Sequence, residues 1–217
     1  MNIRNTLAFA VLYGIVIIPF LGESNSPNVK NAVKEFAPCD EKPPTSITVD
    51  VQPFGDISTE KINYVFKELV KVYPDVKLKK AIPLPKFAFY EGRKRYRADS
   101  LINYLRQQTA SGHVTIGLTN KDISTTNDNI KDWGVMGLGY CPGESCVVST
   151  FRLSKQDLLV QLFKTSIHEL GHTQGLNHCP VKTCFMRDAE GKNCTNEEKE
   201  FCAKCKAHLI SKGWDLK

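Results

Sequence analysis

Residues 168–178 read HELGHTQGLNH and follow the pattern H-E-x-x-H-x-x-G-x-x-H. On a helix, His168 and His172 lie one turn apart on the same face, so both imidazoles can reach one metal ion. Gly175 can adopt a positive φ, which ends the helix and turns the chain back so that His178 can supply a third ligand. Three protein ligands leave the fourth tetrahedral position of a zinc ion open, which is typical of catalytic rather than structural zinc.

Glu169 stands beside the first of these ligands and can reach a zinc-bound water without occupying a coordination position. Zinc lowers the pKa of such a water to about 7, and a carboxylate base can accept its proton as the water attacks a carbonyl carbon. The resulting carboxylic acid can then protonate the leaving amine. The pattern therefore predicts a catalytic zinc site, with Glu169 as the general base that acts on the zinc-bound water.

Four of the eight cysteines form a second set of candidate metal ligands. Cys179 and Cys184 follow the third histidine, and Cys202 and Cys205 lie one helical turn apart. Two thiolates from a loop and two from a helical turn predict a closed, structural zinc site. The alternative is a pair of disulfides, because exported proteins often carry them. A Cys202–Cys205 disulfide within one turn would be strained, whereas a cross-pair such as Cys179–Cys202 would not.

The remaining cysteines are Cys39, Cys141, Cys146 and Cys194. Cys141 and Cys146 flank a Pro-Gly turn and can form a small disulfide loop in an oxidising compartment. For Cys39 and Cys194 both states stay open, because they can pair with each other or remain free thiols.

Residues 1–24 are predicted to be a signal peptide or a membrane anchor. Arg4 precedes an uncharged, apolar run at residues 7–22, as in the basic and apolar parts of a signal peptide. The run is shorter than the ~20 residues that a spanning helix prefers, but no A-x-A cleavage site follows it. We therefore expect an exported protein (secreted, periplasmic or lumenal) or a membrane-anchored one. Residues 25–45 are polar and predict a linker or arm.

Residues 46–217 are expected to form the catalytic domain. Alternating apolar residues predict a strand at 47–51, and an i, i+3, i+4, i+7 stripe after Ser58 predicts a core-facing helix. The segments expected further along are a helix at 98–108, a buried strand at 114–118, a polar loop at 120–131, and a hairpin formed by 134–140 and 146–153. Strands interleaved with helices indicate the α+β class with one mixed, partly parallel sheet.

Two capping boxes predict where the last helices begin. Ser154 and Asp157 are spaced to start the helix that carries the first two histidines of the motif. Thr195 and Glu198 are spaced to start a C-terminal helix that ends near Lys212.

The run from His168 to Cys205 resembles the archaemetzincin family of zinc peptidases. The resemblance rests on Cys179 directly after the third histidine, on Met186 two residues after Cys184, and on the final C-x-x-C. Upstream segments similar to the same family are Arg95-Tyr96-Arg97-Ala98, Gly117-Leu118-Thr119 and Val148-Ser149. The resemblance covers roughly residues 46–212.

This resemblance implies a compact metzincin fold with an active-site helix, a C-terminal helix and two zinc ions per chain. One zinc would be catalytic and held by the three histidines, with Met186 in a Met-turn beneath it. The other would be structural and held by the four cysteines. By analogy with other metzincins, residues 147–150 are expected to be the strand edge that pairs with an extended substrate. Aminopeptidase activity on short peptides is suggested by some members of the family.

The charge pattern limits the partners. The net charge of +6 is only mildly basic, and the basic residues do not cluster near the cysteines, which disfavours a zinc-ribbon-like nucleic-acid binder. The run Arg93-Lys94-Arg95-Tyr96-Arg97 is expected to be a solvated loop, with recognition of an acidic partner as the alternative. We expect a monomer that acts on peptides or proteins and binds no nucleic acid.

Glu169 bears on the choice between an enzyme and a zinc protein without activity, and Tyr140 on the details of catalysis. A non-catalytic, zinc-stabilised binding module is the main alternative function, but a purely structural site has no need of the base Glu169. Tyr140 is the nearest candidate for an additional oxyanion donor, although an ordinary packing role is expected for it.

Overall fold

The structure is a computed structural model that describes residues 47–55, 57–189 and 191–217. The predicted signal peptide or anchor at 1–24, the linker at 25–45 and Cys39 lie outside the described residues, so these expectations stay predictions. Within the described ranges, no helix combines the length and the apolar character needed to cross a membrane.

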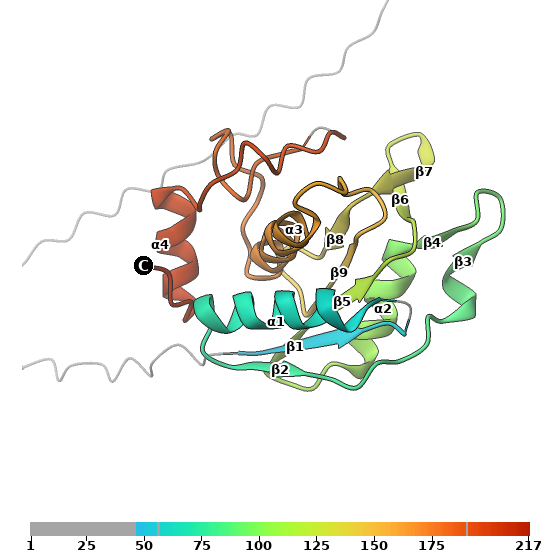
Figure 1. Cartoon of the computed structure of the whole chain (residues 1–217), viewed down its shortest axis with the longest axis horizontal. Helices are drawn as coiled ribbons and strands as arrows, with labels where there is room; N and C mark the ends of the chain where they lie inside the picture. Colours follow the sequence, from blue (N-terminus) through green and yellow to red (C-terminus); the bar gives the residue numbers. More distant parts are fainter. Residues whose placement is uncertain (1–46, 56, 190) are drawn as a thin grey trace, which may run out of the picture. The chain divides into compact units, whose positions relative to one another are not determined.

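A five-stranded sheet forms the centre of the fold (Figure 1), with the strand order β2-β1-β5-β9-β8. Its members are β1 (Thr48–Pro53), β2 (Val76–Leu78), β5 (His113–Thr119), β8 (Gly137–Gly139) and β9 (Ser145–Ser149). The first four strands in this order pair in parallel, and β8 pairs antiparallel to β9 at the edge. The predicted mixed, partly parallel sheet is confirmed, as is the α+β class.

A second, four-stranded sheet was not expected from the sequence. It has the order β3-β4-β6-β7 and consists of β3 (Phe89–Tyr90), β4 (Arg95–Arg97), β6 (Ile123–Asn127) and β7 (Ile130–Val135). The predicted polar loop at 120–131 is therefore wrong, because this segment contains β6 and the first residues of β7. Only Ile123 and Ser124 of β6 are buried; the threonines that follow favour extended backbone without looking apolar.

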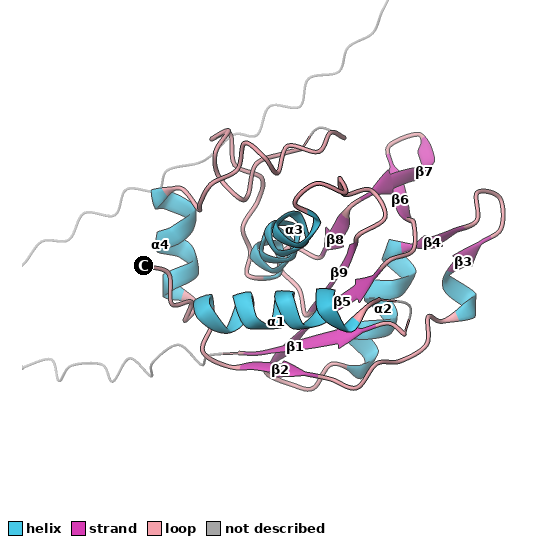
Figure 2. Cartoon of the chain, in the orientation of Figure 1, coloured by secondary structure: helices cyan, strands magenta, loops and turns pink. Residues whose placement is uncertain are grey.

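Helices cover both faces of the larger sheet (Figure 2), with α1 (Thr59–Val72) and α3 (Leu158–Thr173) on one face and α2 (Ala98–Gln108) on the other. The remaining helices are α4 (Ala203–Ser211) and the short 3-10 helix η1 (Lys86–Ala88). Strand β9 shows how the faces divide, since Cys146 and Val148 join the core beneath α1 and α3 while Val147 joins the core beneath α2. This alternation follows from the two-residue period of a strand. It leaves α3, the helix of the histidine motif, packed on one face of the central sheet.

The two predicted capping boxes do not form. Helix α3 begins at Leu158 after Asp157, whose φ is +54° and whose side chain makes no capping hydrogen bond. Helix α4 begins at Ala203, well after Thr195. The residues before α4 are extended instead, because Lys199 N donates to Thr183 O (2.9 Å) and Phe185 N donates to Glu200 O (3.1 Å). Pairing with another segment has replaced the local cap.

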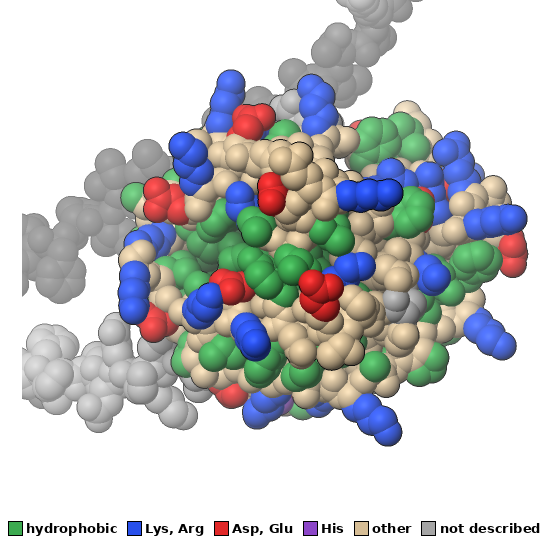
Figure 3. All heavy atoms as spheres, viewed as in Figure 1, with side chains coloured by type: hydrophobic (Ala, Val, Ile, Leu, Met, Phe, Trp, Pro, Cys, Tyr) green, Lys and Arg blue, Asp and Glu red, His purple; other side chains and the backbone are tan. Residues whose placement is uncertain are grey.

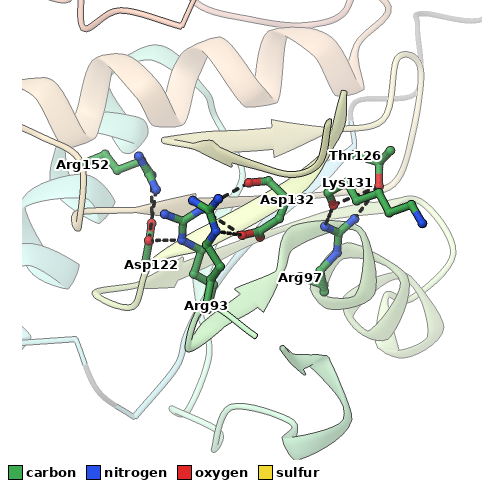
Figure 4. Close-up of polar contacts among 8 residues, drawn as sticks. Arg93, Arg97, Asp122, Thr126, Lys131, Asp132 and Arg152 are labelled. Atoms are coloured by element: carbon green, nitrogen blue, oxygen red, sulfur yellow. Dashed lines mark hydrogen bonds and ion pairs between the residues drawn. The ribbon is translucent and has the colours of Figure 1, made fainter. Parts of the chain in front are cut away.

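The basic run at residues 93–97 is only partly a solvated loop. Figure 4 shows Arg93 reaching Asp132, and Arg93 remains 65% exposed. Arg95, by contrast, lies in β4 with only 17% of its side chain exposed and bridges Asp122 (2.6 Å) and Asp132 (3.1 Å). Lys and Arg side chains are nevertheless prominent over the smaller sheet on the face shown in Figure 3. The expectation of a fully solvated run is therefore wrong for its second half.

Asp122 joins the smaller sheet to the segment after β9. Besides its ion pair with Arg95, Asp122 accepts two parallel hydrogen bonds from the guanidinium of Arg152, at 2.8 and 3.0 Å (Figure 4).

We expect Asp122→Asn to lower the free energy of unfolding by about 2–3 kcal/mol, because two arginines lose a half-buried counter-charge. Urea denaturation would measure this. As a control, Glu68→Gln, which removes an exposed pair with Lys71, should cost less than about 1 kcal/mol; equal losses would contradict the prediction.

Candidate functional site

The histidines of the motif converge at the end of α3. His168 and His172 lie one turn apart, with their Nε2 atoms 3.1 Å from each other. Gly175 has a φ of +92°, as the sequence predicts, and its N–H closes the end of the helix on His172 O at 2.8 Å. The turn brings His178 back, so that one ring nitrogen of each of the three residues lies within 4.8 Å of the others.

Each of the three imidazoles has an oxygen atom at its Nδ1. These oxygens are Phe185 O for His168 (2.6 Å), Leu176 O for His172 (2.7 Å) and Asp188 Oδ2 for His178 (3.3 Å). A backbone carbonyl can only accept, so the first two rings carry their proton on Nδ1 and turn the lone pair of Nε2 toward the other histidines. This arrangement of outer hydrogen bonds is typical of metal-ligating histidines.

The donor set fits zinc. Two nitrogens on a tetrahedral zinc ion at about 2.0–2.1 Å would be about 3.3 Å apart, close to the 3.1 Å between His168 and His172. Burial, followed by the nearness of His172, lowers the pKa of His168 to about 3. The ring is therefore neutral near pH 7 and can offer its lone pair to a cation.

Glu169 lines the same cavity as the three imidazoles and lies against the two glycines of β8. A Cβ atom on Gly137 would lie 2.5 Å from Glu169 Oε1, and one on Gly139 would lie 2.9 Å from its carbonyl oxygen. Burial raises the pKa of Glu169 to about 8; a dication on the histidines would lower it again, since an opposite charge favours the carboxylate. Glycines at both positions leave the space that the Glu169 side chain occupies.

We expect Gly137→Ala to reduce peptidase activity while leaving most of the stability intact. The new methyl group has to displace the carboxylate of Glu169, the general base predicted from the sequence, and small displacements of such a group can cost about 100-fold in rate. Gly55→Ala is the matched control, because its nearest neighbour would be Ile82 O at 3.8 Å. Comparing kcat and the urea midpoint of both variants tests the prediction; wild-type kcat in Gly137→Ala would overturn it.

Met186 lies beneath the histidines, where the resemblance to the family places a Met-turn. Its side chain is fully buried, and its Sδ atom would be 2.5 Å from a Cβ atom on Gly171. Gly171 stands between the two histidines of α3, so Met186 packs directly on the turn of helix that carries them. The carbonyl of Phe185, the residue before Met186, orients the ring of His168.

The four cysteines Cys179, Cys184, Cys202 and Cys205 form one cluster, with their sulfur atoms within 4.8 Å of one another. The Sγ atoms of Cys179 and Cys202 are 3.7 Å apart, close to the ~3.8 Å expected for two thiolates on one tetrahedral zinc and far from the ~2.05 Å of a disulfide. Cys184 Sγ accepts hydrogen bonds from Met186 N (3.5 Å) and Cys202 N (3.3 Å). The geometry favours the zinc site over the disulfide alternative.

The residues on either side of the cysteine turn at 141–146 differ in part from what the sequence predicts. Cys141 and Cys146 are both free thiols, one exposed and one buried, so the small disulfide loop is not formed. Cys146 points into the core because it belongs to β9. Tyr140 donates its hydroxyl proton to Asn103 Oδ1 at 2.9 Å, which is the packing role expected for it. Residues 147–150 are not a free edge either, since β9 pairs with strands on both sides and β8 is the edge strand.

A cavity of about 1010 Å³ contains the three histidines and Glu169. One side is formed by β8 and the β6–β7 hairpin, and the other by the chain between Arg187 and Glu198. Trp133 of β7 meets Gly191 across the cavity, where a Cβ atom on the glycine would be 2.7 Å from the indole ring. The site is therefore a cleft in which Trp133 and Gly191 lie close to each other.

Several residues of the site escape sequence reasoning. Asp188 is one residue of an ordinary polar loop until the fold places it at His178. Gly137, Gly139 and Gly171 matter because of side chains that reach them from distant positions. A G-x-G pattern before the cysteine turn is the only signal that could have drawn attention to the first two.

Comparisons with known proteins agree with this geometry. Residues 59–211 match the model of Peptidase family M54. The chain is 32% identical over 171 residues to the archaemetzincin of Halobacterium salinarum, a match that covers 72% of this chain and 96% of that one. It is 35% identical over 146 residues to the archaemetzincin of Methanopyrus kandleri, which covers 64% of this chain and 81% of that one.

Solved structures show the same fold. The crystal structure of the Methanopyrus kandleri archaemetzincin superimposes with a TM-score of 0.63 at 28% identity, and the match covers 77% of this chain and 96% of that one. The archaemetzincin of Archaeoglobus fulgidus, solved in complex with malonate, gives a TM-score of 0.64 at 24% identity and covers 75% and 99%. The chain therefore belongs to the archaemetzincin family, peptidase family M54, and is a zinc metallopeptidase.

Proposed function

We propose that the chain hydrolyses peptide bonds at the three histidines, with Glu169 as general base. The observation that carries the proposal is the position of the buried Glu169 carboxylate, which lines one cavity with His168, His172 and His178. The rings of His168 and His172 turn Nε2 toward one another and are held there through Nδ1. A structural metal site needs neither an adjacent carboxylate nor a cavity of this size.

In this proposal the residues around the histidines have separate roles in the reaction. Zinc, when bound at the histidines, supplies a Lewis acid that polarises the scissile carbonyl and acidifies the attacking water. Glu169 accepts the proton of that water and passes it to the leaving amine. Asp188, through His178, and the carbonyl of Phe185, through His168, keep the imidazoles in position.

We propose that the substrate lies in extended form along β8. This strand is the edge of the larger sheet, and its residues Gly137 to Gly139 line the cavity beside Glu169. An extended peptide can add to such an edge through main-chain hydrogen bonds. Trp133 and Gly191 lie close to each other at the cavity, which favours short peptides and chain ends over folded proteins. This supports the suggested aminopeptidase activity.

We further propose that the four-cysteine cluster holds a second, structural zinc. The cluster is largely buried, with Cys184 fully so, and four thiolates leave no coordination position for a substrate. It ties the segment of Met186 to the start of α4, because Cys179 and Cys184 come from the first and Cys202 and Cys205 from the second.

The test is a digest of a synthetic peptide library by the zinc-loaded, full-length chain, followed by mass spectrometry. We expect cleavage that disappears after treatment with a zinc chelator and returns with added zinc. Elemental analysis should give two zinc ions per chain. Zinc-loaded protein that cleaves no peptide would favour the non-catalytic binding module, and one zinc per chain would contradict the second site.

A further inference from the structure

Glu198 has a position that its predicted role as a helix cap does not explain. It lies in the extended segment before α4 and lines the same cavity as the histidines. The backbone there is fixed by Lys164 of α3, whose ammonium group donates to Thr195 O at 2.7 Å and to Glu198 O at 2.6 Å. Lys164 stands one helical turn before His168, so Glu198 is held close to the candidate metal site.

The Glu198 carboxylate is buried without a partner. The residue is only 6% exposed, yet no hydrogen bond or ion pair to its side chain occurs among the described residues. Burial raises the pKa of Glu198 to about 7, although Lys164 and Arg187 act in the opposite direction. A buried carboxylate is costly unless a positive group or hydrogen-bond donors compensate for it. Glu198 also lines the cavity, so a ligand bound there can supply the missing partner.

The cations of this chain near the cavity are already engaged or lie at its rim. Lys164 is bound to the two backbone carbonyls, Arg152 to Asp122 (2.8 Å) and Arg187 to Glu197 (2.7 Å). Lys192 is exposed. The Thr165 hydroxyl, which also lines the cavity, donates to Gln161 O at 2.9 Å and thus keeps only acceptor capacity. This part of the cleft offers acceptors and negative charge to a ligand.

We propose that Glu198 binds an ammonium group of the peptide substrate, either its α-amino group or the side chain of a lysine. The inference rests on the proposed peptidase function and narrows its substrates. Glu198 and the three histidines line the same cavity, so the bound ammonium group belongs to the peptide that occupies this cleft. An α-amino group held there makes the protein an aminopeptidase, whereas a lysine makes it selective for basic peptides.

A binding experiment separates this inference from the hydrolysis itself. Zinc-loaded, full-length Glu169→Gln protein is immobilised and offered an arginine-free pool of synthetic decapeptides in three forms. The first form has free amines, the second is acetylated at the N-terminus, and the third is acetylated at the N-terminus and at every lysine. Mass spectrometry measures which peptides are retained. We expect the free form to be retained about 10–100-fold better than the third, as for loss of a charge-assisted hydrogen bond.

The second peptide form distinguishes the two sources of the ammonium group. Retention equal to that of the free form assigns the site to lysine, and retention equal to that of the third form assigns it to the α-amino group. Adding Glu198→Gln to the immobilised Glu169→Gln protein should abolish its preference for peptides with free amines. Adding Glu198→Asp, which keeps the charge, should retain part of this preference. Glu200→Gln, a change at an exposed position of the same segment, should leave the preference intact.

The outcomes separate the two proposals. An amine preference that survives in Glu198→Gln protein with native zinc content and circular dichroism overturns the cation site. If the wild-type chain hydrolyses no peptide but the preference depends on Glu198, the cation site stands and the proposed hydrolysis fails. If the wild-type chain hydrolyses free and fully acetylated peptides at equal rates, the proposed hydrolysis stands and the cation site fails.

Discussion

Glu169→Gln is expected to lower kcat by about 10²–10⁴-fold, the range that a positioned general base contributes. Glutamine has nearly the same shape and fits the space left by Gly137 and Gly139, but it cannot accept a proton from water. The three histidines are unchanged, so the zinc content should stay at the wild-type value. Steady-state kinetics on a peptide cleaved by the wild-type chain, together with elemental analysis, would measure both quantities.

Glu60→Gln provides the control for this experiment, because Glu60 is exposed in the first turn of α1 and should leave kcat unchanged. Full activity in Glu169→Gln would exclude Glu169 as the base. A loss of activity accompanied by a loss of zinc would mean that the carboxylate supports the metal site rather than the proton transfer.

Cys184→Ala is expected to produce the largest loss of stability. It removes a fully buried ligand of the four-cysteine cluster, and loss of a structural metal is among the few changes that cost about 4 kcal/mol or more. For a protein of this size that corresponds to roughly 8–16 °C in Tm. Calorimetry and zinc analysis should show the lower Tm together with one zinc per chain instead of two.

Cys146→Ala is the matched control for the loss of a buried thiol. Cys146 is also fully buried but lies in β9, outside the metal cluster. It should lose only about 1 kcal/mol from the small cavity and keep both zinc ions. Equal effects of the two substitutions would show that the cluster holds no structural metal.

The sequence predicts those parts of the site that depend on local geometry. The positions of His168 and His172 follow from the helical period, and the return of the chain to His178 follows from the positive φ available to Gly175. The helix at 98–108 has the predicted limits, because apolar spacing and burial agree there. Such features require only neighbours within a few residues.

The parts that sequence reasoning missed depend on contacts between distant segments. The hairpin at β6–β7 carries polar threonines and looks like a loop until it pairs with β4. Glu198 has the spacing of a capping box, but pairing of its neighbours with residues 183–185 keeps the backbone extended. In both cases a long-range partner determined the conformation that local propensity had left open.

Three consecutive residues, 184–186, connect the two candidate metal sites. Cys184 belongs to the cysteine cluster, Phe185 O accepts the Nδ1 proton of His168, and Met186 packs against Gly171 of α3. Occupancy of one site should therefore change the affinity of the other, and thermodynamic linkage requires this coupling to be reciprocal. Zinc loading of the chain is then expected to be cooperative: filling of the cysteine cluster prepares the histidines for the second ion.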